Sequence, residues 1–421
     1  MTAQSVIFHV DVNSAFLSWE AIYRRNAGMT DMDLRTIPSA VGGDSEKRHG
    51  IILAKSIPAK RFGVQTGEPV IKALEKCPEL VLVSPHYPYY EECSGKLMRL
   101  LSEYSSLVVP LSIDEAFLDM SESVALFGDP MEIARKIRER VRDEFGFTVN
   151  IGISSNKFLA KMASDFKKPD LCHSLFPEEI PAKLWPLPIR DLYGAGRATQ
   201  TRLSTLGLKT IGDVAATDRE ILKAHLGKSH GEMIWKHANG IDPEPLVLED
   251  GPLKGYGNSI TLSMDITDTD IARQVLLSLS ETVGARLRAA NVTCEQVTVE
   301  LKDAEFVRRT HQCPLLSATN STDIIYRTAC KLLSEFWHNE PIRLLGIRTG
   351  RISEESFSQM NLFDFDVQKS AKLEKLDRAI DSIRSRFGND AVKRASFLSP
   401  DTPRDPGGRD RRSKLFGHTE D

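Results

Sequence analysis

Short apolar runs alternate with amphipathic segments over residues 1–168, and this alternation limits the possible folds more than any other feature. The run at 6–10 is rich in β-branched and aromatic residues and predicts a buried strand, whereas apolar residues recur at helical spacing from Ser14 onward. Strands and helices that alternate in one region predict an α/β or α+β sheet domain. The same pattern predicts further strands at 50–55, 108–111, 116–120 and 148–153, and helices at 70–75, 90–104, 133–145 and 156–166.

The length of the chain predicts more than one domain. It has 421 residues, more than the roughly 250–300 at which a single hydrophobic core stops growing. Hydrophobic residues make up 41% and charged residues 27%, which excludes a mainly disordered or fibrous protein. Prolines after residue 169 mark a linker to short helices, and a second break at 242–252 precedes strand, long helix, strands, helix and strand over 255–351. A charged amphipathic helix is expected at 369–387 and a disordered polar end from Pro400.

Three compositional features bear on location and partners. No stretch approaches ~18 uninterrupted apolar residues, and no basic segment precedes the first strand, so neither a membrane span nor a secretory signal is expected. Six cysteines are scattered singly, which favours reduced thiols in a cytoplasmic protein over a zinc site or a disulfide framework. The net charge of −3 argues mildly against a nucleic-acid-binding protein, because such proteins are often strongly basic.

Three carboxylates stand where predicted strands end or begin. Asp11 ends the first strand, and Asp114 and Glu115 lie in the tight turn between two others. Strands of one sheet are ~5 Å apart, so carboxylates at neighbouring strand ends can converge on a metal ion. Oxygen donors suit Mg²⁺, and two such ions could hold the attacking and leaving oxygens of a phosphoryl displacement. For Asp11 alone, a turn-forming or helix-capping role is the simpler interpretation.

Motifs along the chain resemble those of the Y-family (translesion) DNA polymerases. Residues 9–16 are similar to the opening motif of that family, and residues 111–119 are similar to its central catalytic motif. Because the matches keep one order over roughly residues 5–400, the chain is identified as resembling bacterial members of the polymerase IV or UmuC-like branches. Further matches lie at 63–64, 152–161, 194–196, 206–213 and 257–259.

The resemblance implies an α+β multidomain fold, the right-hand polymerase with palm, small fingers, helical thumb and little finger. The thumb would be helix-hairpin-helix-like, and its glycine turn at 193–196 could meet a DNA phosphate through backbone N–H groups. A plain helix–turn–helix explains that turn equally well. The implied boundaries are palm 1–16 and 77–168, fingers 17–76, thumb 169–245, little finger 246–355 and a C-terminal tail 356–421.

The resemblance also implies a catalytic site. Asp11, Asp114 and Glu115 would be the catalytic, metal-binding acids for two Mg²⁺ ions. The carbonyl oxygen of Val12 would be a further ligand. Phe16 would be the steric gate, whose ring closes the space that a ribose 2′-hydroxyl would need. From the pattern alone, Phe16 is a core aromatic of the first helix.

The incoming nucleotide would meet basic side chains and backbone amides. By the resemblance, Lys60 and Lys161 would bind the triphosphate, next to Phe16. The backbone around Ser14 and Ala15, near a helix N-terminus, could hold phosphates as well. Without the resemblance, each lysine is most simply a solvated surface residue.

Three positions depart from the polymerase IV pattern. Asn13, Ile57 and Lys60 stand where a second Asp, a Tyr and an Arg are common. Asn13 and Lys60 are instead similar to the polymerase V branch, so the subfamily stays open. These departures are the only support for the alternative function, a non-catalytic DNA- and sliding-clamp-binding accessory protein of the same fold.

The segment 359–363 has the form Gln-x-x-Leu-Phe. Gln359, Leu362 and Phe363 resemble the sliding-clamp-binding peptide of bacterial polymerases, although a helix-capping or core-docking segment is the alternative. The expected partners are primer-template DNA, a dNTP and the sliding clamp, with no membrane, and the chain is expected to be a cytoplasmic monomer. With no excess of positive charge, DNA binding is expected to be weak, salt-sensitive and clamp-dependent.

Overall fold

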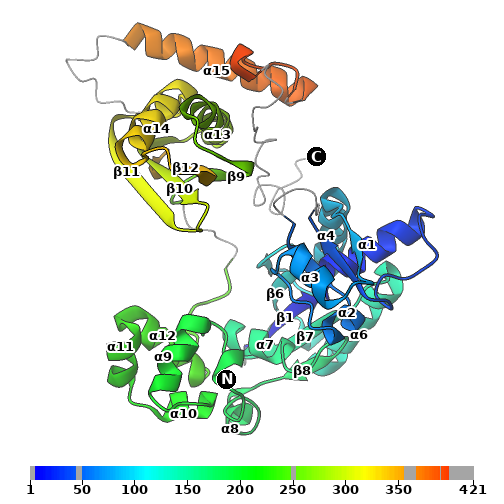
Figure 1. Ribbon diagram of the computed structural model, residues 1–421. Coiled ribbons are helices and arrows are strands. Elements are labelled where there is room, and N and C mark those ends of the chain that lie inside the picture. The colour runs from blue at the N-terminus through cyan, green and yellow to red at the C-terminus, as the bar shows by residue number, and fades with distance from the viewer. Residues whose placement is uncertain (1–4, 44–49, 248–252, 355–366, 389, 398–421) are drawn as a thin grey trace. The chain divides into compact units, whose positions relative to one another are not determined.

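The computed structural model describes residues 5–43, 50–247, 253–354, 367–388 and 390–397, which form two compact units (Figure 1). The first unit holds the described residues up to 247 and the second holds those from 253 onward. None of the helices in these ranges is long and apolar enough to cross a membrane. The expected α+β multidomain class is confirmed, because each unit has its own sheet and its own hydrophobic core.

The first unit begins with mixed strands and helices and ends with helices alone. The mixed part contains β1 (Ile7–Val12), α1 (Ala15–Asn26), β2 (Ser39–Gly42), β3 (Ile52–Lys55), α2 (Ile57–Arg61), α3 (Val70–Lys76), β4 (Val81–Val83), α4 (Tyr87–Ser102), β5 (Val108–Pro110), β6 (Glu115–Asp119), α5 (Val124–Phe127), α6 (Pro130–Phe145), β7 (Val149–Ser154), α7 (Lys157–Ser164) and β8 (Cys172–Ser174). The helical part contains η1 (Pro177–Glu179), α8 (Ile180–Lys183), η2 (Ile189–Asp191), α9 (Arg197–Thr205), α10 (Ile211–Ala216), α11 (Arg219–Leu226) and α12 (Lys228–Ala238).

The predicted elements of this unit are present, with shifted ends. The helix predicted at 90–104 begins earlier, at Tyr87, because Pro88 is well suited to the first turn of a helix. The strand predicted at 116–120 begins at Glu115, so one of the candidate acids is itself a strand residue.

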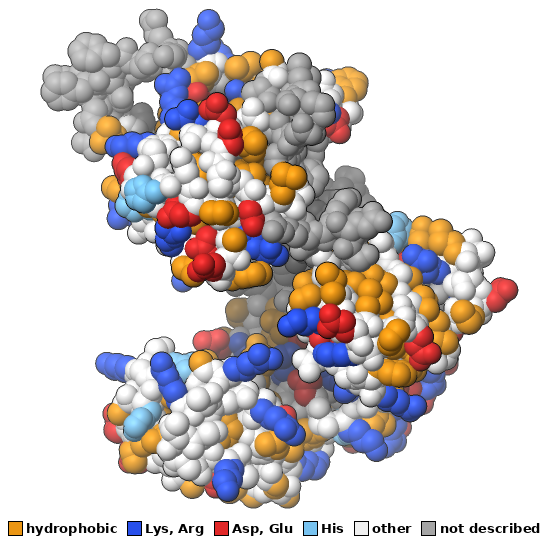
Figure 2. Space-filling view, viewed as in Figure 1, with side chains coloured by type: hydrophobic (Ala, Val, Ile, Leu, Met, Phe, Trp, Pro, Cys, Tyr) orange, Lys and Arg blue, Asp and Glu red, His pale blue; other side chains and the backbone are white. Residues whose placement is uncertain are grey.

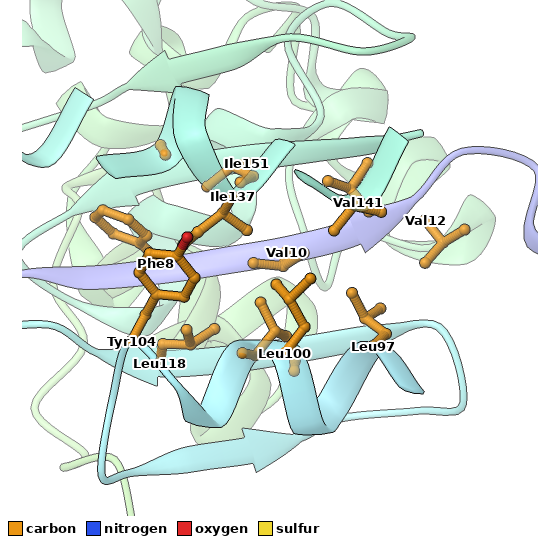
Figure 3. Close-up of a cluster of buried hydrophobic side chains, with 14 of the residues drawn as sticks. Phe8, Val10, Val12, Leu97, Leu100, Tyr104, Leu118, Ile137, Val141 and Ile151 are labelled. Carbon is orange, nitrogen blue, oxygen red and sulfur yellow. The ribbon is translucent and has the colours of Figure 1, made fainter. Parts of the chain in front are cut away.

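A five-stranded sheet in the order β5-β6-β1-β7-β8 is the centre of the first unit. Side chains of β1 alternate between its two faces. Phe8, Val10 and Val12 point into a buried cluster with residues of α4 and α6 (Figure 3). The other face of β1 carries His9 and Asp11, which are paired with Phe117 and Glu115 of β6. One face of the strand is therefore hydrophobic core, and the other face is polar.

Helix α7 lies against the polar face because Gly152 of β7 has no side chain. A Cβ at Gly152 would lie 1.9 Å from the carbonyl oxygen of Ala160 and 2.4 Å from the backbone nitrogen of Ser164. The helix begins where the side chain of Asn156 accepts a hydrogen bond from the backbone nitrogen of Leu159, at 2.8 Å. This close approach brings α7 over the strands that carry the acids.

A smaller sheet in the order β3-β2-β4 packs with α2 and α3 in the same unit. Helix α1 joins the two sheets, because Trp19 and Ile22 pack in the core of the large sheet while Leu17 and Ala21 pack in that of the small one. Strand β4 lies beyond residue 76, the expected end of the fingers. The boundaries drawn from the sequence stay predictions.

The second unit is built on a four-stranded antiparallel sheet in the order β11-β10-β12-β9. The predicted order of strand, long helix, strands, helix and strand is confirmed, and the two long helices cover one face of the sheet. The elements are β9 (Gly257–Ile266), α13 (Thr269–Ala289), β10 (Thr293–Asp303), β11 (Arg308–Thr319), α14 (Thr322–Phe336), β12 (Ile342–Ser353), α15 (Val367–Phe387) and η3 (Ala395–Phe397).

The last long helix, α15, was expected at 369–387 and is held to α13 by buried charges. The guanidinium of Arg288 donates to Asp381 at 2.6 Å and lies 3.3 Å from Asp377. The side chains of Arg288 and Asp377 are only 6% and 7% exposed, and Asp377 also accepts a hydrogen bond from the backbone nitrogen of Thr322 at 2.9 Å. The charged helix expected in the C-terminal tail is therefore part of the second unit.

Candidate active site

The three candidate acids lie together on the polar side of the large sheet. Asp11 of β1 and Glu115 of β6 are directly opposite each other in the antiparallel pair. Asp114 precedes Glu115, and its carbonyl oxygen accepts a hydrogen bond from the backbone nitrogen of Val12 at 3.0 Å. Directly opposed residues on neighbouring strands have Cβ atoms about 5 Å apart, so strand pairing brings the carboxylates of Asp11 and Glu115 together.

Two lysines hold the carboxylates at opposite ends of this group. The amine of Lys168 donates to Asp11 at 2.9 Å and lies 2.8 Å from Asp165. The amine of Lys161, on α7, donates to Glu115 at 2.7 Å. The Asp114 carboxylate instead accepts from the hydroxyl of Ser112 at 2.6 Å.

Burial and these neighbours shift the acids in different directions. Burial raises the pKa of Asp11 to about 6, although Lys168 opposes the shift. Burial also raises the pKa of Asp114. Burial favours a higher pKa for Glu115 too, but His9 and Lys161 more than offset it and lower the pKa to about 2. The group is therefore a buried concentration of negative charge that needs positive partners.

The chemistry of these residues fits Mg²⁺. They offer only oxygen donors, namely the carboxylates of Asp11, Asp114 and Glu115 and the carbonyl of Val12. In the described ranges, no group of three or more His, Cys, Asp or Glu side chains lies close enough to hold a metal ion. Asp11 and Glu115 each bind a lysine amine, and these amines supply positive charge next to the site.

A cavity of about 450 Å³ opens beside Asp11 and Asp114. Its wall includes the turn from β1 into α1, where Ser14 has a left-handed backbone conformation with φ 49. Left-handed and helical residues in succession turn backbone N–H groups toward one concavity, a geometry that binds anions. The predicted nucleotide contacts Ser14, Ala15, Phe16 and Lys60 all line this cavity.

Sequence reasoning missed Lys168, which lines the same cavity. The composition changes after the run Lys167-Lys168-Pro169-Asp170, and nothing in the pattern set Lys168 apart from other surface lysines. Lys161, by contrast, is not among the residues that line this cavity. Lys60 and Lys168 therefore line one cavity, and Lys161 lies at Glu115, which is opposite Asp11 in the sheet.

Lys161 lines a second cavity of about 850 Å³ between the sheet and the helical part of the first unit. Its amine lies 5.3 Å from the centre of the ring of Tyr193, the first residue of the predicted glycine turn. The ring of Phe158 stacks on His237 of α12 at 4.3 Å. Four further lysines line this cavity: Lys157, Lys223, Lys228 and Lys236.

The departures from the polymerase IV pattern have local explanations. Asn13 donates a hydrogen bond through its amide to the hydroxyl of Thr148 at 3.1 Å, which a carboxylate could not donate. Ile57 is 55% exposed at the start of α2 and lines the smaller cavity with Lys60. Each residue changes one part of the cavity wall and leaves the three acids in place.

The predicted clamp-binding segment and the charge balance of the surface are separate from both cavities. The candidate clamp-binding residues Gln359, Leu362 and Phe363 lie outside the described residues. Basic and acidic side chains are interspersed on both units in the face drawn in Figure 2, in keeping with the net charge of −3.

Comparison with protein families gives three matches along the chain. The impB/mucB/samB family matches residues 10–165, and the C-terminal domain of the same family matches residues 253–362. A family described as the thumb domain of DNA polymerase-iota matches residues 190–242.

Individual relatives match nearly the whole chain. DNA polymerase IV of Clostridium acetobutylicum is 42% identical over 393 residues, covering 93% of this chain and 98% of the relative. DNA polymerase IV of Acetivibrio thermocellus is 38% identical over 93% of this chain and 97% of the relative. DNA polymerase IV 2 of Bacillus subtilis is 37% identical over 95% and 96%.

A solved structure shares the fold as well. The Y-family DNA polymerase chimera Dbh-Dpo4(243-245)-Dbh superposes with a TM-score of 0.70 and 25% sequence identity. The match covers 82% of this chain and 99% of that structure. Both units are therefore included in the similarity.

Proposed function

Because the chain belongs to the impB/mucB/samB family and is a DNA-directed DNA polymerase of the Y family, we propose that it extends primers across damaged template bases. The observation that supports this most is the register of β1 and β6, which sets Asp11 against Glu115 next to a cavity that holds Phe16. The small sheet beside the cavity has strands of only 3 or 4 residues, and such small fingers would leave room for a bulky template base.

The proposed chemistry is nucleotidyl transfer. The 3′-oxygen of the primer forms a bond to the α-phosphorus of a dNTP, and the bond to pyrophosphate breaks. Asp11, Asp114, Glu115 and the carbonyl of Val12 would hold two Mg²⁺ ions. When bound, these ions would neutralise the triphosphate and favour loss of the 3′-hydroxyl proton. Strand pairing keeps Asp11 and Glu115 opposed before substrate arrives, and the amines of Lys168 and Lys161 would give way to the ions.

The cavity walls suggest how the nucleotide is held. The amides of Ser14 and Ala15 and the amines of Lys60 and Lys168 would bind the triphosphate. The ring of Phe16 would lie against the sugar and exclude a 2′-hydroxyl. Lys161 would hold Glu115 through its hydrogen bond and would add positive charge to the wall of the larger cavity.

DNA would bind through basic residues on both units. The lysines of the larger cavity would contact the backbone without reading sequence. On the second unit, the sheet face opposite α13 and α14 carries Lys302, Arg308 and Arg348 on neighbouring strands. Because its proposed substrate is DNA and its relatives are bacterial, the protein would act in the bacterial cytoplasm. A non-catalytic accessory role is not favoured, because the three acids are intact and the relatives are DNA polymerases.

The test of translesion synthesis is primer extension on paired templates. We expect the wild-type protein, with Mg²⁺ and dNTPs, to insert a nucleotide opposite an abasic site and to extend beyond it. The control is the same template without the lesion. A protein that copies the undamaged template but stops before the abasic site would keep the polymerase function and contradict the translesion role.

The two lysines of the smaller cavity should affect nucleotide binding, and Lys161 should not. We expect Lys60→Ala and Lys168→Ala each to raise the KM for dNTP about tenfold, since each removes one charge-assisted contact to phosphate. Lys161→Ala should lower kcat with little change in KM, because its amine contacts Glu115. Steady-state single-nucleotide insertion separates the two effects, and Lys72→Ala, on the exposed side of α3, is the control. A raised KM in Lys161→Ala alone would reverse the assignment.

The candidate clamp peptide is testable apart from catalysis. We expect deletion of residues 359–363 to abolish stimulation by the bacterial sliding clamp and to leave clamp-independent extension unchanged. The measurement is the length of primer extension products with and without the clamp. Equal stimulation of the deletion variant and the wild type would exclude this segment as the clamp-binding site.

A further inference from the structure

The ring of Phe16 rests on a second aromatic ring that the mechanism does not use. Phe16 stacks on Tyr90 of α4, with ring centres 5.0 Å apart and planes at 18°. Tyr87 meets Phe16 edge-on at 6.0 Å and 87°. Phe16 also lines the smaller cavity. The position of its ring in the cavity therefore depends on the position of Tyr90.

Tyr90 is itself fixed by a buried acid on the helix that carries Phe16. Its side chain is 0% exposed, and its hydroxyl donates to Glu20 at 2.6 Å. Glu20 is only 1% exposed, and its other oxygen accepts from Arg24 at 2.7 Å. A buried carboxylate is strongly unfavourable unless it is paired and hydrogen-bonded. Tyr90 and Arg24 supply the hydrogen bonds that Glu20 needs.

The spacing along α1 explains why these groups meet. Phe16, Glu20 and Arg24 are separated by four residues each and so lie along one side of the helix. Tyr90 packs against this side, with its ring under Phe16 and its hydroxyl at Glu20. A phenylalanine at position 90 could fill the same hydrophobic space. The hydrogen bond from the Tyr90 hydroxyl to Glu20 therefore fixes the orientation of the ring, which packing alone does not specify.

We propose that Glu20 and Tyr90 are positioning residues for sugar selection: their hydrogen bond fixes the ring under Phe16 and so sets how strictly the polymerase rejects ribonucleotides. This inference rests on the proposed role of Phe16 as the steric gate. A displacement of about 1 Å in a positioning group can change a rate by about a hundredfold, so a small tilt of the Phe16 ring is enough to admit a 2′-hydroxyl.

The test compares insertion of a dNTP and of the matching rNTP by Phe16→Ala and four further variants. We expect Tyr90→Phe and Glu20→Gln each to lower the ratio of kcat/KM for dNTP to that for rNTP about tenfold, mainly through faster rNTP insertion. The double variant should show no more than the larger single effect, because both changes act on one interaction: glutamine has a single oxygen for the two donors that Glu20 binds. Tyr104→Phe is the matched control, since it removes the hydroxyl of another buried tyrosine of the same core, bound to Arg140 at 3.2 Å.

Two results would overturn the proposal, and a third would overturn its premise. If Phe16→Ala relaxes sugar selection but Tyr90→Phe and Glu20→Gln keep the wild-type ratio, the gate stands without this support. If Tyr104→Phe relaxes selection as much as Tyr90→Phe, the effect is general loosening of the core. If Phe16→Ala keeps the wild-type ratio, the gate role itself is wrong.

Discussion

Replacing Asp114 with alanine is expected to lower nucleotide incorporation by about a thousandfold or more. Among the three acids, Asp114 gives the clearest experiment. Asp11→Ala would leave the amine of Lys168 without one of its partners, and Glu115→Ala would leave the largely buried amine of Lys161 unpaired. Asp114 instead accepts from Ser112, and no described lysine donates to it, so its removal leaves no buried charge alone. The loss should therefore report chemistry rather than folding.

Single-turnover incorporation with Mg²⁺ measures this effect, with DNA affinity and Tm measured on the same variants. Asp119→Ala is the matched control. Asp119 lies on the same strand and the same face of β6 as Glu115, but it caps a turn by accepting from the backbone nitrogen of Ser121 at 2.9 Å. The Asp119→Ala variant should incorporate nucleotides at a rate within a few fold of the wild-type rate. Wild-type activity in Asp114→Ala would show that the metal ligands were assigned wrongly.

The second large effect is expected at the steric gate. Phe16→Ala should lower discrimination against ribonucleotides by about a hundredfold or more, because it removes the ring that lines the cavity where the sugar would lie. Insertion of dNTP should fall much less, since the acids and lysines are unchanged. The ratio of kcat/KM for dNTP and rNTP measures the effect.

Because alanine also removes packing against Tyr90 and Trp19, Phe16→Leu provides a milder second variant. It should relax selection less than alanine does and keep a Tm close to wild type. Phe62→Ala removes an exposed phenylalanine that follows α2 and should leave selection unchanged. Strict exclusion of ribonucleotides by both Phe16 variants would argue for another gate.

The strand ends that carry the three acids could be predicted from the sequence because they depend on local pattern. An apolar run that ends in Asp11, and a turn with Asp114 and Glu115 between two apolar runs, predict strand ends without knowledge of the rest of the chain. If these strands are neighbours in one sheet, their ends bring the acids close together. The structure shows that β1 and β6 are neighbours and gives their register. Strand periodicity therefore carries most of the information about this part of the site.

The lysines could not be predicted in the same way, because their roles depend on packing between distant segments. Lys161 and Lys168 lie seven residues apart and have the same chemistry, yet one lines the larger cavity and the other the smaller. Lys161 lies on α7, which packs closely on Gly152, whereas Lys168 lies in the segment after that helix. The docking of α15 was missed for a related reason, since the charges of Asp377 and Arg288 predict solvent exposure until their partners are known.

The alternation of β1 has a consequence for how such an enzyme can change over generations. Substitutions at the cavity wall, such as those at positions 13, 57 and 60, each alter one contact and can accumulate singly. Insertion of one residue within β1 would instead exchange the two faces beyond that point, turning Asp11 toward the hydrophobic core and a valine toward the substrate. Lineages can therefore diversify in substrate handling by point mutation, while the length of this strand is inherited unchanged or the enzyme is lost.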